Sequence, residues 1–194
     1  MISYPTDLKN RLFFTVQDVA ESRGISIASA RVLCNRYVQK GVFVRLKKNF
    51  YILDRNWERY GAWEFFKIAN FLQVPSYISC MTALSFHGVT TQVQRNWYES
   101  IALKRSINRE VNNVLFSYHK IRPDYYFGFH RREGFFVATP EKALLDSVYL
   151  NALGRYPLDW KSLDTKLLDM AQLNKFMEPF PPTVRSRMDR LCKN

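Results

Sequence analysis

The residues of this chain best suited to binding a ligand are basic and polar side chains between positions 26 and 49. They are Ser26, Ser29, Arg31, Val32, Asn35, Arg36, Arg45, Lys47, Lys48 and Asn49. Arg and Asn can each make paired hydrogen bonds to the edges of guanine and adenine in the major groove. Lys and Arg neutralise phosphates or enter the minor groove. These residue types therefore predict a surface that contacts double-stranded DNA.

Two short helices and a glycine turn are predicted to position the first of these residues. Thr15 can cap a helix that ends at Gly24, and Ser26 can cap a second helix that ends at Gly41. Ile25, between the two helices, is expected to point inward. The second helix has an apolar stripe at three- and four-residue spacing, made of Ala30, Leu33, Cys34 and Tyr37. The opposite, polar face of this helix is then exposed.

The residues after Gly41 predict a hairpin. Residues 42–46 are mostly β-branched or apolar, Lys47, Lys48 and Asn49 form a turn, and residues 50–52 return as a strand. Helix, turn, helix and hairpin is the order of a winged helix-turn-helix. The same residues are also compatible with a small scaffold that has a solvated basic face and binds a protein instead of DNA.

The chain is long enough for one large or two small domains, and its composition is basic. The formal charge of the 194 residues is +12, and residues 1–54 contribute +5 of it with nine Lys or Arg against four Asp or Glu. The excess is therefore spread over the chain, which suits a polyanionic partner. The three cysteines have no zinc-site spacing, and no segment has the roughly 18 apolar residues of a membrane span. We expect a reduced, cytoplasmic protein that does not associate with membranes.

We place the domain boundary near residue 55, so that residues 1–54 form the winged helix-turn-helix domain and 55–194 a C-terminal α+β domain. A helix over 4–13 is expected to pack against the first domain. In the second domain we expect an antiparallel sheet, with strands at 97–103, 114–121, 125–130 and 135–138. The expected helices cover 57–72, 80–87 after a Ser79 cap, a segment beginning at Thr139-Pro140-Glu141, 163–176 and 184–191.

Catalytic chemistry has little support in the sequence. The chain has no Asp-x-Asp pair after a Gly-Ser turn, as a nucleotidyltransferase would need for magnesium. His87 is expected to cap a helix end and not to act with Cys80. Glu141 and Asp146 could bind a cation or partner, but we favour a helix-dipole role for Glu141 and a solvent-facing Asp146. We predict no catalytic residues, no metal and no cofactor.

Basic residues also lie around the predicted strand ends of the C-terminal domain. They are Arg105, Arg109, Arg122, Arg131 and Arg132. They could extend a DNA contact or face a partner protein, or they could simply be solvated.

Three blocks of the sequence together resemble one protein family. They are Lys48 to Ile52, Ser79 to Gln92 (SCMTALSFHGVTTQ), and Ala138 to Asp146 (ATPEKALLD). In this order and spacing they resemble the AbiEi-type antitoxins of type IV toxin–antitoxin systems, over roughly residues 14 to 150. The wing of that family usually has glycine where this chain has Asn49. Because Asn tolerates positive φ, we expect the turn to form.

The resemblance implies a regulator of phage-defence type. Its winged helix would bind inverted repeats in its own promoter and repress the operon. Its C-terminal domain would neutralise a nucleotidyltransferase-like toxin without a stable complex. An alternative is an antitoxin whose winged helix docks a protein partner, and a third is a nucleic-acid-processing enzyme.

Overall fold

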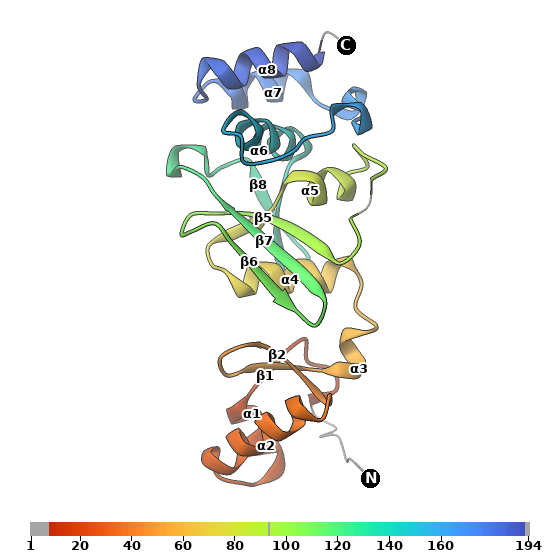
Figure 1. The fold of residues 1–194 in the computed structure, drawn as a ribbon, viewed down its shortest axis with the longest axis vertical. Helices are drawn as coiled ribbons and strands as arrows, with labels where there is room; N and C mark the ends of the chain where they lie inside the picture. The colour runs from red at the N-terminus through yellow and green to blue at the C-terminus, as the bar shows by residue number, and fades with distance from the viewer. Residues whose placement is uncertain (1–7, 93, 193–194) are drawn as a thin grey trace. The chain divides into compact units, whose positions relative to one another are not determined.

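The computed structural model describes residues 8–92 and 94–192, and these form a mixed α+β fold (Figure 1). Grouped by their contacts, the residues fall into two compact units, Met1–Phe65 and Phe66–Asn194. Each unit has its own sheet.

The first unit consists of two helices and a three-stranded sheet. Its elements are β1 (Phe14–Thr15), α1 (Val16–Arg23), α2 (Ile27–Gln39), β2 (Phe43–Lys47), β3 (Phe50–Leu53) and α3 (Asp54–Trp57), followed by the start of α4 (Ala62–Leu72). The strand order is β1-β3-β2 and both pairings are antiparallel. The predicted helices and hairpin are thus present, and β1 adds a strand that the sequence did not suggest.

The helix ends of this unit follow the predicted capping. The Thr15 hydroxyl accepts from the N–H of Asp18 at 3.2 Å, and the Asp18 carboxylate accepts from the N–H of Thr15 at 2.7 Å. Gly24 ends α1 with φ of +60°. The Ser26 hydroxyl accepts from the N–H of Ser29 at 3.1 Å. Each cap satisfies a backbone donor that the helix itself leaves unpaired.

Three expectations for this unit are wrong. Ile25 is 37% exposed, so it does not point inward. The expected helix over 4–13 lies partly outside the described residues, and residues 11–13 are not helical although Leu8 is buried. The expected helix over 57–72 is wrong at its start, because residues 58–61 are not helical and α4 begins only at Ala62.

Aromatic rings hold the sheet of this unit against α2. The Phe43 ring makes edge contacts with Phe14 and Tyr37, at centroid distances of 4.8 and 5.0 Å. Phe14 also stacks on Tyr51. Cys34 lies in the same core, and burial raises the pKa of its thiol to about 11. Such a thiol is inert, as expected for a core position.

The second unit has a six-stranded sheet with the order β6-β7-β5-β4-β9-β8. Its elements are β4 (Ser76–Ile78), α5 (Cys80–Phe86), β5 (Trp97–Ala102), β6 (Ile107–Val111), β7 (Val114–Lys120), η2 (Pro123–Tyr125), β8 (Phe129–Arg132), β9 (Phe135–Ala138), α6 (Pro140–Ala152), η3 (Trp160–Ser162), η4 (Thr165–Leu167), α7 (Met170–Met177) and α8 (Pro182–Cys192).

This sheet is mixed, so the expected antiparallel sheet is wrong. The pairs β5–β7 and β4–β9 are parallel, whereas β4–β5, β6–β7 and β8–β9 are antiparallel. The sequence prediction missed β4 and β6, and it placed a strand over 125–130 where η2 precedes β8. The expected helix over 163–176 is also wrong, because this stretch contains η4 and only later α7.

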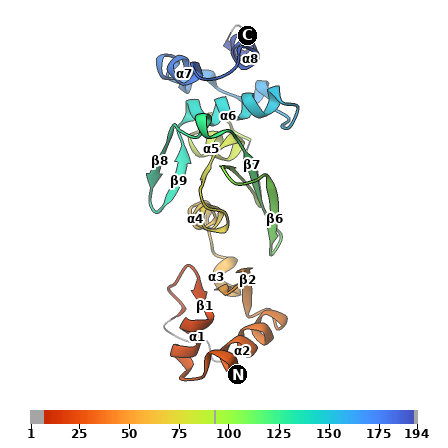
Figure 2. The ribbon, with the colours of Figure 1, turned by 90° about the vertical axis from the view of Figure 1, so that its left-hand side faces the viewer.

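Helices cover the curved sheet. Figure 2 shows the β6–β7 and β8–β9 hairpins on opposite sides of α4. The Tyr118 hydroxyl donates to the carbonyl of Ala69 at 2.6 Å, and the N–H of Phe136 donates to Asn70 Oδ1 at 2.5 Å, so both sides are tied to α4. On the other side α6 contacts α5, α7 and α8. The middle helix α6 is consequently buried along most of its length.

A buried ion pair lies on α6. Lys142 Nζ contacts Asp146 Oδ1 one turn away, and both side chains have no exposed surface. Asp146 also accepts from the hydroxyls of Tyr77 at 2.9 Å and Ser79 at 2.7 Å. The expected solvent-facing Asp146 is therefore wrong, and Ser79 bonds this carboxylate instead of capping α5. Thr139 does cap α6 as predicted, through the N–H of Lys142.

Aromatic rings enclose the lysine of this pair. Lys142 Nζ lies 5.2 Å from the Phe127 ring centroid, 5.6 Å from that of Phe180 and 5.7 Å from that of Tyr77. A Cβ on Gly128 would lie 2.9 Å from Lys142 Cγ, so only glycine fits there. Burial raises the pKa of Asp146 and lowers that of Lys142, and in each case the partner's charge opposes the shift. The pair joins α6 to β4, to the residues before β8 and to those before α8.

We predict that Asp146→Asn lowers the free energy of unfolding by about 3–5 kcal/mol, because it leaves a buried ammonium without its counter-ion. Urea unfolding followed by circular dichroism measures this. Asp124→Asn is the matched control, since Asp124 pairs with Arg122 and both side chains are about two-thirds exposed. Asp124→Asn should lower the free energy of unfolding by less than about 1 kcal/mol. Equal effects of the two changes would contradict the account.

A second buried carboxylate lies on β5. Glu99 has no exposed surface and accepts from the Tyr156 hydroxyl at 2.9 Å. Its other oxygen lies 4.0 Å from His119 Nε2. Burial raises the pKa of Glu99 to about 7, and burial also lowers the pKa of His119. Both shifts favour the neutral forms of the two side chains.

Glu99 makes stability depend on pH. Its pKa is about 7 in the folded state against 4.5 as the ordinary value, so its contribution to stability is complete below pH 4.5 and is lost as pH rises through 7. The free energy of unfolding of wild type relative to Glu99→Gln should fall between pH 5 and 8, by up to about 3 kcal/mol. Parallel denaturation curves at these two pH values measure it. A difference between the two proteins that stays constant with pH would contradict the assignment.

Candidate nucleic-acid interface

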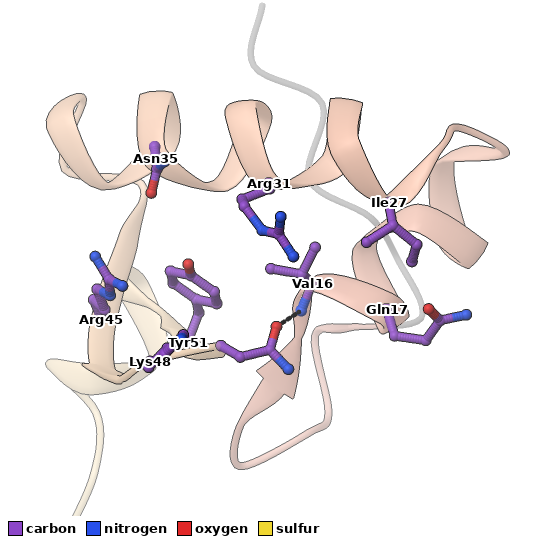
Figure 3. A pocket seen from close by; sticks show the side chains of 9 residues that line it. Val16, Gln17, Ile27, Arg31, Asn35, Arg45, Lys48 and Tyr51 are labelled. Atoms are coloured by element: carbon purple, nitrogen blue, oxygen red, sulfur yellow. Dashed lines mark hydrogen bonds between the residues drawn. The ribbon is translucent and has the colours of Figure 1, made fainter.

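Five of the ten predicted DNA-binding residues meet at a hollow in the first unit. Its volume is about 630 Å³, and α2, the start of α1 and the β2–β3 hairpin surround it. Figure 3 shows it from close by. Its lining residues are Val16, Gln17, Ile27, Arg31, Asn35, Arg45, Lys48, Asn49 and Tyr51.

Helix α2 supplies one wall of this hollow. Ile27, Arg31 and Asn35 are four residues apart, so they share one side of the helix. In Figure 3 the Arg31 and Asn35 side chains extend from α2 toward the hairpin. A guanidinium and a carboxamide are therefore presented together, and both can make paired hydrogen bonds to a nucleic-acid group.

The hairpin supplies the opposite wall. Arg45 lies on β2, Lys48 in the turn and Tyr51 on β3. Burial raises the pKa of the Tyr51 hydroxyl, whereas the positive charges of Arg45 and Arg31 oppose the shift. Both guanidinium groups thus act on the same hydroxyl from the two walls.

The hollow has a positive electrostatic character. Three of its lining residues are cations, Arg31, Arg45 and Lys48, and none of the lining residues is an acid. A phosphate between the walls would interact with all three charges. Because the hollow is open to solvent, salt would screen this attraction.

Asn49 has a positional role that the sequence did not reveal. Its φ is +69°, which confirms that the turn forms with asparagine at this place. Its Oδ1 accepts from the N–H of Val16 at 3.3 Å, the dashed line of Figure 3. Val16 is the first residue of α1, so the bond satisfies a donor at a helix start and ties the hairpin turn to that helix.

The remaining predicted residues lie outside this hollow. Val32 is 67% exposed, and Arg36 is also exposed on the outer side of α2. The Ser26 hydroxyl donates to the Ser29 hydroxyl at 2.9 Å, so both are engaged at the helix start. Lys47 is half-buried with its ammonium 5.2 Å from the Phe50 ring centroid.

Four lining residues were missed by sequence reasoning, namely Val16, Gln17, Ile27 and Tyr51. Ile27 could have been found from the four-residue spacing that it shares with Arg31 and Asn35. Gln17 and Tyr51 could not, because they reach the hollow only through the packing of α1 and β3. Tyr51 is nearly fully buried in the core, and its sequence position suggests nothing more than a strand residue.

Residues considered for other chemistry are placed in the second unit. Cys80 is fully buried, and burial raises the pKa of its thiol well above the ordinary value. His87 is the C-terminal cap residue of α5, and its Nε2 donates to the carbonyl of Ala138 at 2.8 Å. Within residues 8–92 and 94–192, no group of three or more His, Cys, Asp or Glu side chains is arranged to hold a metal ion.

No helix in the described part of the chain is both long enough and apolar enough to span a membrane. Compared with models of known protein families, the sequence matches none, and it matches no curated protein. Conclusions about function therefore depend on the geometry of the hollow and on the sequence.

We predict that Asn49→Ala destabilises the first unit more than Asn49→Gly does. Glycine adopts the positive φ without strain and loses only the hydrogen bond, so it should lower the free energy of unfolding by about 1 kcal/mol. Alanine also adds the strain of the left-handed conformation, so it should lower the free energy of unfolding by about 2 kcal/mol in total. Urea unfolding of the full chain measures both values. Equal losses would show that the backbone conformation at position 49 carries no cost.

Proposed function

We propose that the Met1–Phe65 unit is a winged helix-turn-helix that binds double-stranded DNA, and that the protein is a transcriptional regulator. The order of α1, turn, α2 and hairpin supports this proposal. The observation that carries it is the hollow between α2 and the hairpin, where three cations and an asparagine converge with no acid among the lining residues.

In this proposal α2 lies in the major groove and the hairpin follows the backbone. Asn35 and Arg36 contact base edges, and the exposed Val32 can contact a thymine methyl group. Arg31, Arg45 and Lys48 enclose a phosphate in the hollow. Ser26 and Ser29 keep the start of α2 capped and compact, so that its backbone can approach the DNA closely.

The resemblance to AbiEi-type antitoxins indicates the biological role that this DNA binding would have. On that basis we propose a cytoplasmic, non-enzymatic repressor of its own operon, which binds inverted repeats and whose second unit neutralises a nucleotidyltransferase-like toxin. A second candidate is an antitoxin that docks a protein with the same basic surface. The positive hollow would then receive a carboxylate in place of a phosphate.

Substitution of the two guanidinium groups tests the DNA proposal. Arg31→Ala with Arg45→Ala should weaken binding to a selected DNA site and reduce the slope of log affinity against log salt by about 1, because the two residues share one phosphate in the hollow and each neutralised phosphate accounts for about 0.9. Fluorescence anisotropy at several salt concentrations measures this. Lys9→Ala with Arg59→Ala is the control, since both residues are exposed cations of the same unit outside the hollow.

Asn35→Ala should give a different result. It should reduce discrimination between the selected site and single-base variants by about 1–3 kcal/mol while leaving the salt slope unchanged. If both substitutions leave DNA affinity and slope as in wild type, the DNA proposal is wrong. Loss of a protein partner with the same variants would then support the docking alternative.

A further inference from the structure

A second hollow lies in the Phe66–Asn194 unit and has a different composition. Its volume is about 900 Å³. The end of α6, the segment with η3 and η4, and helix α8 contribute to it. Its lining residues are Asn151, Leu158, Asp159, Trp160, Lys161, Leu163, Thr165, Arg187 and Arg190.

Hydrogen bonds hold the segment that forms one wall. The N–H of Asp164 donates to the carbonyl of Val89 at 2.7 Å, and Leu163 forms an antiparallel bridge with Thr90. The hydroxyl of Ser162 donates to the carbonyl of Asp159 at 2.8 Å. The wall is thus attached to the loop after α5, although its secondary structure consists only of short 3-10 turns.

The charged groups of this hollow favour an anion. Lys161, Arg187 and Arg190 are cations and Asp159 is the one acid in the lining. Asp159 is engaged through both oxygens, by the N–H of Lys161 and by Gln92 Nε2, each at 3.1 Å. Its oxygens therefore hold the segment, and the three cations against this one acid leave the lining with a net charge of +2.

One of the two arginines is held in place. Arg187 Nη1 donates to the Asn151 carbonyl at 3.3 Å and also contacts Asn151 Oδ1. Arg190 follows three residues later, so it lies on the same side of α8. Two guanidinium groups one turn apart suit phosphate oxygens, which accept paired hydrogen bonds from them.

The rest of the lining is apolar and aromatic. Trp160, Leu158 and Leu163 are all half-buried and lie beside the cations. An indole offers a face on which a nucleic-acid base can stack. The volume is also within the range of small-molecule sites, which is about 300–1,000 Å³.

We propose that this hollow binds a nucleotide, with its phosphates at Lys161, Arg187 and Arg190 and its base against Trp160. A free nucleotide and the phosphorylated end of a nucleic-acid strand share this chemistry. The proposal is independent of the DNA-binding role of the first unit, because none of these residues belongs to that unit.

Titration calorimetry of the full chain tests the proposal. The probes are ATP, GTP, CTP and UTP, inorganic tripolyphosphate, and a 5′-phosphorylated dinucleotide. Arg190→Gln leaves the bond between Arg187 and Asn151 intact and should weaken nucleotide binding about tenfold, as loss of a charged hydrogen-bond partner does. Trp160→Leu should weaken the binding of nucleotides but not the binding of tripolyphosphate. Arg185→Gln, on the same helix but outside the hollow, should leave binding unchanged.

Each result has a defined meaning. Tighter binding of a nucleoside triphosphate than of the dinucleotide identifies a free nucleotide as the ligand, and the reverse identifies a strand end. The proposal is overturned if no nucleotide binds below about millimolar concentration. It is also overturned if tripolyphosphate binds as tightly as nucleotides, or if Arg190→Gln and Arg185→Gln have equal effects. An acidic peptide that binds where nucleotides do not would overturn it as well.

Discussion

The bonds between the hairpin and the start of α1 determine the geometry of the first unit. Strand β1 pairs with β3 in the register Phe14 to Tyr51 and Thr15 to Phe50, and the side chain of Asn49 bonds the N–H of Val16. Because Thr15 also caps α1, one short segment joins the sheet to the helix. The aromatic core then fixes α2 against β2. The backbone positions of Arg31, Arg45 and Lys48 around the hollow follow from these contacts.

Buried charge has a different role in the second unit. The pair of Lys142 and Asp146 joins α6 to distant parts of the chain, and its value is less in net stability than in specifying one arrangement of these elements. Among the described residues of this unit, the buried ionisable acids are Glu99, Glu141 and Asp146, against one buried cation, Lys142. The exposed surface is consequently more positive, by two charges, than the sequence of the unit implies.

Helix caps and turn conformations, which depend on neighbouring residues, could be predicted from the sequence, whereas long-range packing could not. The caps by Thr15, Ser26 and Thr139 and the positive φ at Asn49 depend on neighbouring residues, and all four were predicted. The parallel pairing of β5 with β7 depends on a crossover that no local pattern specifies. From the sequence alone Asp146 resembles a surface acid. Its hydrogen-bond partners Tyr77 and Ser79 lie on β4 and directly after it, far away along the chain. The members of the first hollow on α2 could likewise be predicted, whereas the bond of Asn49 to Val16 could not.

The most direct test of the central claim is a gel-shift assay with the DNA immediately upstream of this protein's own gene, at two salt concentrations beside a scrambled sequence. The account predicts selective binding to the upstream DNA that weakens steeply as salt rises, because several phosphates are neutralised. Binding no stronger than to the scrambled control would contradict it. The positive hollow would then have to be assigned to a protein partner.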